Sequence, residues 1–87
     1  VIDISGRSFL VFKYKPKNPM IGDYDTQMTE EFFRAVAFNM GATLHLEVLY
    51  GQNDHHMTEA LFKAFAHAAA EALAPKSGAV LSAKGVL

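Results

Sequence analysis

Two adjacent histidines begin the longest predicted helix of the sequence, and a carboxylate and an amine follow at helical spacing. His55 and His56 precede Glu59 by four and three residues. Lys63 follows Glu59 by four more. At about 100° per residue, all four fall within one quadrant of the helix, and each imidazole is within side-chain reach of the carboxylate. Imidazole and carboxylate ligands without sulfur suit divalent ions such as Mn²⁺, Fe²⁺ or Zn²⁺.

The adjacency of the two histidines favours two metal ions over one. Neighbouring side chains on a helix diverge by about 100°, so His55 and His56 point in different directions. His45 is a further candidate ligand, because it lies on the polar face of the strand predicted before this helix and the intervening turn can bring it close. With Glu59, these residues give at most four ligands, enough for one site or half of two. Two complete sites would need ligands from another copy or another half.

Simpler interpretations of the same residues stay open. Adjacent histidines at a helix start are often solvated, and an HHxxE string alone is a weak motif. His45 could be an ordinary surface residue of a strand, and Glu59 an acid that interacts with the helix dipole. His67, three turns along the helix, is expected to be a solvated residue.

A second group of residues could bind a phosphorylated ligand. Lys63 shares the histidine face, where its long side chain can reach a group bound beside the metals. In the tail 76–87, Ser82 and Lys84 combine a hydroxyl and a cation close to a glycine, which suits a phosphate. Near the other end of the sequence, Arg7 adds a guanidinium. Each is weak alone, because surface lysines and serines are mostly solvated. The lack of a glycine-rich strand-to-helix loop argues against a nucleotide.

The elements that position these residues predict a two-layer α+β domain in the order β-β-α-β-α, with a strand missing at its start. Strands are expected over 1–4, 9–14 and 43–50, and a helix over 55–74. Another helix follows a cap at Asp25 or Thr26 and stops at Gly41, and 15–25 is expected to be a loop. Bulk on both faces of 9–14 predicts a strand covered on both sides. Alternation in the third strand places four residues on its inner face: Leu44, Leu46, Val48 and Tyr50.

Composition narrows the class of protein. The chain has 87 residues, 51% of them apolar and 20% charged, which fits one small folded domain. A net charge of −1 lacks the basic surplus of nucleic-acid binders, and the absence of cysteine excludes disulfides and thiolate metal sites. No apolar run approaches the ~20 residues of a membrane span, and no signal peptide is recognisable, so we expect a cytoplasmic protein without membrane or nucleic-acid partners. A chain this short is marginal alone, which suggests a soluble piece of something larger.

Several separated motifs follow one another along the chain: Asp3–Arg7, Glu31–Arg34, Thr43–His45, Asn53–His56 with Glu59, Phe62–Ala64 and Ser82–Leu87. Together they resemble the C-terminal half of the imidazoleglycerol-phosphate dehydratases, the manganese enzymes of histidine biosynthesis. The resemblance covers nearly the whole chain, and 1–87 would be one half-repeat of such a dehydratase with 76–87 as a phosphate-contacting tail.

The resemblance implies a chain about twice this length, with two similar halves that share a site for two Mn²⁺ ions. It also implies homo-oligomeric cages of about 24 subunits with active sites at subunit interfaces. The implied half-fold is similar to the second domain of ribosomal protein S5. The metal ligands of this half would be His45, His55, His56 and Glu59. The substrate contacts would be Arg7, Lys63, Ser82 and Lys84.

The implied reaction is a hydro-lyase step that converts imidazole glycerol phosphate to imidazole acetol phosphate. Two metals bound to the imidazole ring make that ring an electron sink. We assign no catalytic base, because the resemblance implies one in the other half, and we expect this half alone to be inactive. Ala83 and His67 depart from the family pattern, which has a second serine and commonly an arginine there. The alternatives are a non-catalytic divalent-metal-binding module or inactive fragment, and a structural piece that dimerises through a sheet edge.

Overall fold

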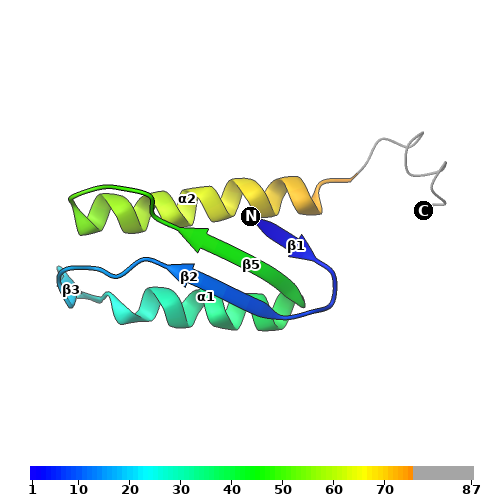
Figure 1. Ribbon diagram of the computed structural model, residues 1–87, viewed down its shortest axis with the longest axis horizontal. Helices are drawn as coiled ribbons and strands as arrows, with labels where there is room; N and C mark the ends of the chain where they lie inside the picture. Colours follow the sequence, from blue (N-terminus) through cyan, green and yellow to red (C-terminus); the bar gives the residue numbers. More distant parts are fainter. Residues whose placement is uncertain (76–87) are drawn as a thin grey trace.

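The computed structural model describes residues 1–75, which form a three-stranded sheet with two helices packed on one face, beside a short hairpin (Figure 1). This arrangement confirms the predicted two-layer α+β class. The elements in chain order are β1 (Ile2–Ile4), β2 (Phe9–Lys13), β3 (Met20–Ile21), β4 (Tyr24–Asp25), α1 (Gln27–Met40), β5 (Ala42–Glu47) and α2 (Asp54–Leu73).

Strand β5 is the centre of the sheet, between β1 and β2. It pairs antiparallel with β1, where Ile2 faces Leu44, and parallel with β2, where Leu10 faces Leu44. A parallel pair needs a long crossover, and α1 provides it between β2 and β5. The register places Ile2, Leu10 and Leu44 on the same face of the sheet, the one that carries the helices.

The core lies between that face and the two helices. Phe33 of α1 is fully buried, and its ring centroid lies 4.9 Å from that of Phe62 and 5.3 Å from that of Phe65, both on α2. These edge and tilted contacts join the helices to each other as well as to the sheet. The buried apolar cluster consists of Phe33, Ala37, Leu44, Leu46 and Leu61. Of the inner positions predicted for the third strand, the first two, Leu44 and Leu46, are therefore confirmed.

Two expectations about burial are wrong. Tyr50 was expected on the inner face but is 89% exposed, because β5 ends at Glu47 and strand alternation stops there. The far face of β2 was expected to be covered, yet no element of residues 1–75 packs on it and Phe9 is 61% exposed. The bulk on that face therefore forms a surface that residues 1–75 leave open.

The ends of α1 follow the predicted capping chemistry. A carboxylate oxygen of Asp25 accepts the Gln27 N–H at 2.9 Å, whereas the Thr26 hydroxyl donates to the carbonyls of Asn18 and Pro19. Gly41 ends the helix at φ +61°, a left-handed conformation in which a side chain would be strained. The segment 15–25, expected as a loop, contains the β3–β4 hairpin. The turn of this hairpin includes Gly22, another glycine with positive φ.

We expect Leu44→Ala to lower the free energy of unfolding by about 2–5 kcal/mol, because the side chain is fully buried and its removal leaves a cavity. Leu49→Ala is the matched control, since that leucine is 80% exposed and should change stability by about 0.5 kcal/mol or less. Urea unfolding followed by circular dichroism measures both. Equal effects of the two substitutions would show that the core is wrongly placed.

Candidate metal centre

The histidine pair lies in the first turn of α2, where the backbone is held by a cap. The Asn53 side chain accepts the His56 N–H at 3.0 Å, and its carbonyl accepts the Met57 N–H at 2.9 Å. Asparagine at this position satisfies a helix-terminal N–H that would otherwise have only water as a partner. The cap fixes the backbone from which both imidazoles project.

Both histidine side chains are exposed and lie next to each other. Their ring centroids are 5.9 Å apart, with the ring planes inclined by 59°. Within residues 1–75, no hydrogen bond or ion pair engages either ring. Glu59 is also exposed, and its carboxylate lies 3.9 Å from the Lys63 ammonium. The structure therefore places all four residues on the exposed side of the helix, as their spacing predicts.

The remaining predicted ligand lies elsewhere. His45 is in β5 between the buried residues Leu44 and Leu46, so its side chain is on the open face of the sheet, away from the helices. Across residues 1–75, no three histidine, cysteine, aspartate or glutamate side chains come close enough together to hold a metal ion. One chain by itself does not gather the four predicted ligands.

The predicted phosphate-binding residues are also separated. Arg7 lies in the turn between β1 and β2, where its carbonyl accepts the Thr43 hydroxyl at 3.0 Å. That turn is at the opposite end of the sheet from the start of α2 (Figure 1). Lys63 is on α2, two turns beyond the histidines. Ser82 and Lys84, with the predicted phosphate-contacting tail 76–87, lie outside the described residues.

Sequence reasoning missed a buried carboxylate directly before the histidines. Asp54 is only 7% exposed and accepts hydrogen bonds from the backbone N–H groups of Lys17 at 3.1 Å and Asn18 at 2.9 Å. The Asn18 side-chain amide donates at 2.9 Å, and the Tyr14 hydroxyl lies 3.3 Å away. The same hydroxyl is 3.3 Å from Thr58, one turn along α2. The carboxylate thus joins the end of β2 and the following loop to the helix.

These contacts set the ionisation of the network. Burial acts to raise the pKa of the Asp54 carboxyl, but the donors from Lys17, Asn18 and Tyr14 outweigh it and hold that pKa below its usual value. Burial raises the pKa of the Tyr14 phenol, and the negative charge of Asp54 raises it further. The network therefore pairs an ionised carboxylate with a protonated phenol at neutral pH.

A helical projection of the sequence contains a signal for this network. Relative to His55, Asp54 falls at about 260° and Thr58 at about 300°, inside the apolar arc of about 220–340° that contains Leu61. Polar residues within a buried arc need hydrogen-bond partners. The projection does not reveal the partners, because they come from a loop 36 to 40 residues earlier.

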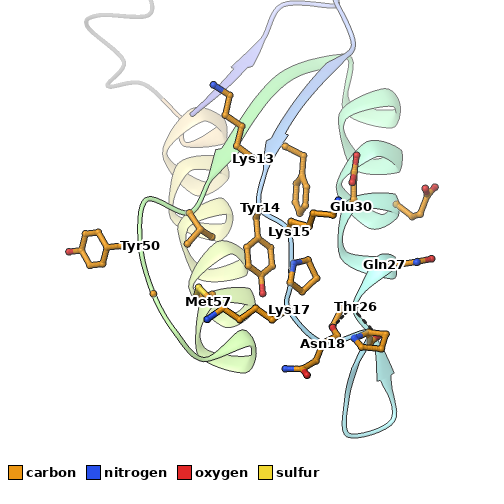
Figure 2. Close-up of a pocket in the computed structure, with 16 residues that line it drawn as sticks. Lys13, Tyr14, Lys15, Lys17, Asn18, Thr26, Gln27, Glu30, Tyr50 and Met57 are labelled. Carbon is orange, nitrogen blue, oxygen red and sulfur yellow. Dashed lines mark hydrogen bonds between the residues drawn. The ribbon is translucent and has the colours of Figure 1, made fainter.

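A groove of about 1100 Å³ runs between this loop and the start of α1 and reaches Met57 of α2. Figure 2 shows Tyr14 and Lys17 on the part of the groove toward the beginning of α2, whereas the Tyr50 ring points outward. A smaller hollow is lined by His56, Met57 and Leu61. The surface beside the histidine pair is thus concave and combines apolar with charged side chains.

Comparison with known proteins places the chain in a family whose members are named as dehydratases. The family model for imidazoleglycerol-phosphate dehydratase matches residues 1–69, and the chain belongs to that family. Neither helix of residues 1–75 combines the length and apolar character needed to cross a membrane.

Individual relatives agree with this assignment. The imidazoleglycerol-phosphate dehydratase of Listeria welshimeri is 57% identical over 88 residues, which cover 99% of this chain and 45% of the relative. That of an Exiguobacterium species is 63% identical over 73 residues, covering 84% and 37%. The crystal structure of imidazoleglycerol-phosphate dehydratase from Staphylococcus aureus matches with a TM-score of 0.84 at 44% identity, over 86% of this chain and 44% of that one. The chain spans less than half the length of these relatives and matches their C-terminal half.

We expect Gly51→Ala to disturb the start of α2. Gly51 has φ +156°, and an added Cβ would lie 2.6 Å from Cγ and Sδ of Met57. The Met57 side chain, which extends from the turn that carries the histidines, would have to move. Gly22→Ala is the matched control, because Gly22 also has positive φ (+61°) but has no neighbour within 4 Å of the added Cβ. Calorimetry should show a lower melting temperature for Gly51→Ala than for the control, and equal values would contradict the close contact.

Proposed function

We propose that this chain provides half of the metal ligands and part of the substrate site for the dehydration of imidazole glycerol phosphate to imidazole acetol phosphate, a step of histidine biosynthesis in the cytoplasm. The observation that carries the proposal is the match of residues 1–69 to the dehydratase family. The exposed imidazole pair and Glu59 at a capped helix start support it from the structure.

The donor chemistry at the start of α2 fits Mn²⁺. Neutral imidazole and carboxylate are ligands that this ion accepts, and a short helix turn presents them in a fixed order. The rings of His55 and His56 have no competing partner within residues 1–75, and the contact of Glu59 with Lys63 is a long, exposed ion pair worth about 0–1 kcal/mol. When bound, two Mn²⁺ ions would supply the Lewis acidity that stabilises negative charge on the imidazole ring of the substrate.

The spatial separation of the predicted residues supports a site assembled from more than one segment. His45 is on the open sheet face, and Arg7 is at the end of the sheet remote from the histidine pair. If His45, His55, His56 and Glu59 are all ligands, they must serve different metal positions or meet ligands from other copies. We therefore propose that the N-terminal half or other subunits complete the site. The assembly would be a large homo-oligomer of about 24 subunits, as the family resemblance implies.

Lys63 would place positive charge beside the bound substrate. Its side chain is 72% exposed and extends from the same side of α2 as Glu59, so it can swing to a phosphate or hydroxyl without breaking a buried contact. Arg7, Ser82 and Lys84 stay proposed phosphate contacts. We assign no residue of this chain as the catalytic base.

A second function follows from the length of the match. Because the chain spans 45% of the Listeria relative, it can act as a divalent-metal-binding module or an inactive fragment without the whole enzyme's activity. Metal binding without turnover would distinguish this alternative from the enzyme.

We expect His56→Ala to weaken Mn²⁺ binding by about 10- to 100-fold or more, since loss of even outer-shell partners of a metal ligand has effects of this size. His67→Ala is the matched control, because that exposed histidine lies on the same helix three turns away. Electron paramagnetic resonance of unbound Mn²⁺ during titration measures both dissociation constants.

Activity toward imidazole glycerol phosphate, assayed in the full-length protein and in these 87 residues alone, separates the enzyme from its alternatives. We expect turnover in the first and none in the second. Unchanged Mn²⁺ affinity in His56→Ala, or no Mn²⁺ binding by the full-length protein, would remove both metal-dependent functions.

A further inference from the structure

Three parts of the chain meet at the Asp54 carboxylate. One oxygen accepts the Lys17 N–H at 3.1 Å and lies 3.3 Å from the Tyr14 hydroxyl. The other accepts the backbone N–H and the side-chain amide of Asn18, both at 2.9 Å. Each oxygen therefore has two partners, all from a segment that precedes Asp54 by 36 to 40 residues.

This set of donors is not what a helix cap requires. Asn53 already caps α2 through the His56 N–H. None of the donors to the Asp54 carboxylate belongs to α2, so the contacts hold the helix to its surroundings. Figure 2 shows the loop with Lys17 and Asn18 running past the beginning of α2, where these contacts form. Without them, the described hydrogen bonds of the first turn would be its cap and those of the Tyr14 hydroxyl, which lies 3.3 Å from the Asp54 carbonyl oxygen and 3.3 Å from the Thr58 hydroxyl.

Anchoring at this position controls the direction of both imidazoles. Asp54 immediately precedes His55 and His56, and their side chains project about 100° and 200° around the helix from it. Because the Asp54 side chain points into the loop, the first turn cannot rotate about the helix axis or fray without breaking four hydrogen bonds. The loop thereby fixes which way the two rings face.

We propose that Asp54 is a positioning residue that orients His55 and His56 for metal binding through its contacts with the Lys17–Asn18 loop. The inference rests on the proposed function, because it gives the orientation of these rings a purpose. It also predicts that changes in the loop, which does not belong to the metal site, weaken metal binding.

The chemistry requires a carboxylate at this position. Three of the four partners are N–H groups that can only donate, and they contact both oxygens, so both oxygens must accept. An amide of the same shape would present an NH₂ group to at least one of these N–H donors in either of its two orientations. Asp54→Asn therefore keeps the volume of the side chain but breaks the contacts on one side.

The test compares Mn²⁺ binding in the full-length protein at a temperature where every variant is folded. We expect Asp54→Asn to raise the Mn²⁺ dissociation constant by about 10-fold and to change the resonance spectrum of bound Mn²⁺. This is the lower end of the range for groups bonded directly to a metal ligand, because Asp54 acts on the histidines through the backbone. Asn18→Ala removes one donor but keeps the carboxylate, so it should give a smaller loss in the same direction. Asn39→Ala is the control, because it removes an exposed 2.7 Å hydrogen bond to Ala35 on the other helix.

A purely structural role would lower the melting temperature of Asp54→Asn and leave its Mn²⁺ affinity within twofold of the parent protein, and that result would overturn the proposal. Hydrogen exchange in the metal-free protein provides the second measurement. We expect faster exchange confined to the amides of 55–58 in Asp54→Asn, and unchanged exchange there would also overturn it. If the parent protein binds no Mn²⁺, the proposed function fails, and the exchange measurement alone decides whether Asp54 orders this turn.

Discussion

The buried carboxylate of Asp54 constrains how this half-domain can be assembled. A charge removed from water destabilises the fold unless hydrogen bonds replace its hydration, and here every replacement comes from distant residues of the chain. The residues that follow strand β2 and the first turn of α2 are therefore held together by this one side chain. Local helix formation at 54–58 and tertiary structure are coupled through one side chain, whereas the hydrophobic core around Phe33 joins the rest of the two layers.

This arrangement leaves the residues that could bind a metal or substrate on the surface. The helices use their apolar sides on one face of the sheet, so the histidines of α2 face solvent and His45 lies on the uncovered sheet face. Nothing in residues 1–75 closes a pocket around three potential ligands. In the proposed function, the fold holds these residues at fixed positions and other chains or segments complete the site. A site that needs other segments agrees with a chain that spans less than half of its relatives' length.

The spacing of apolar residues in the sequence predicts the features of the structure that depend on residues close together in the chain. The order of the three sheet strands and two helices, the glycine stop at Gly41 and the buried side of α2 all follow from short-range patterns, and the structure confirms them. The β3–β4 hairpin within the expected loop was not predicted. Tyr50 shows where such patterns fail, because alternation has no meaning once the chain leaves the strand at Glu47. The open face of β2 could not be predicted, since burial depends on which elements are present to cover it. The partners of Asp54 also required three-dimensional structure, because they are distant in sequence.

The two acids in the first turns of α2 illustrate how hydrogen bonding decides the role of a residue. Asp54 is adjacent to the histidines, but both of its oxygens are occupied by donors, so ligating a metal would require breaking the loop contacts. Glu59 lies on the exposed side, and its described side-chain contact is the 3.9 Å ion pair with Lys63, which is weak in water. A divalent ion can displace such a partner at little cost. Residue type alone ranks the two carboxylates equally, and spacing places them on different sides of the helix. Their hydrogen-bond partners then separate a structural anchor from an available ligand.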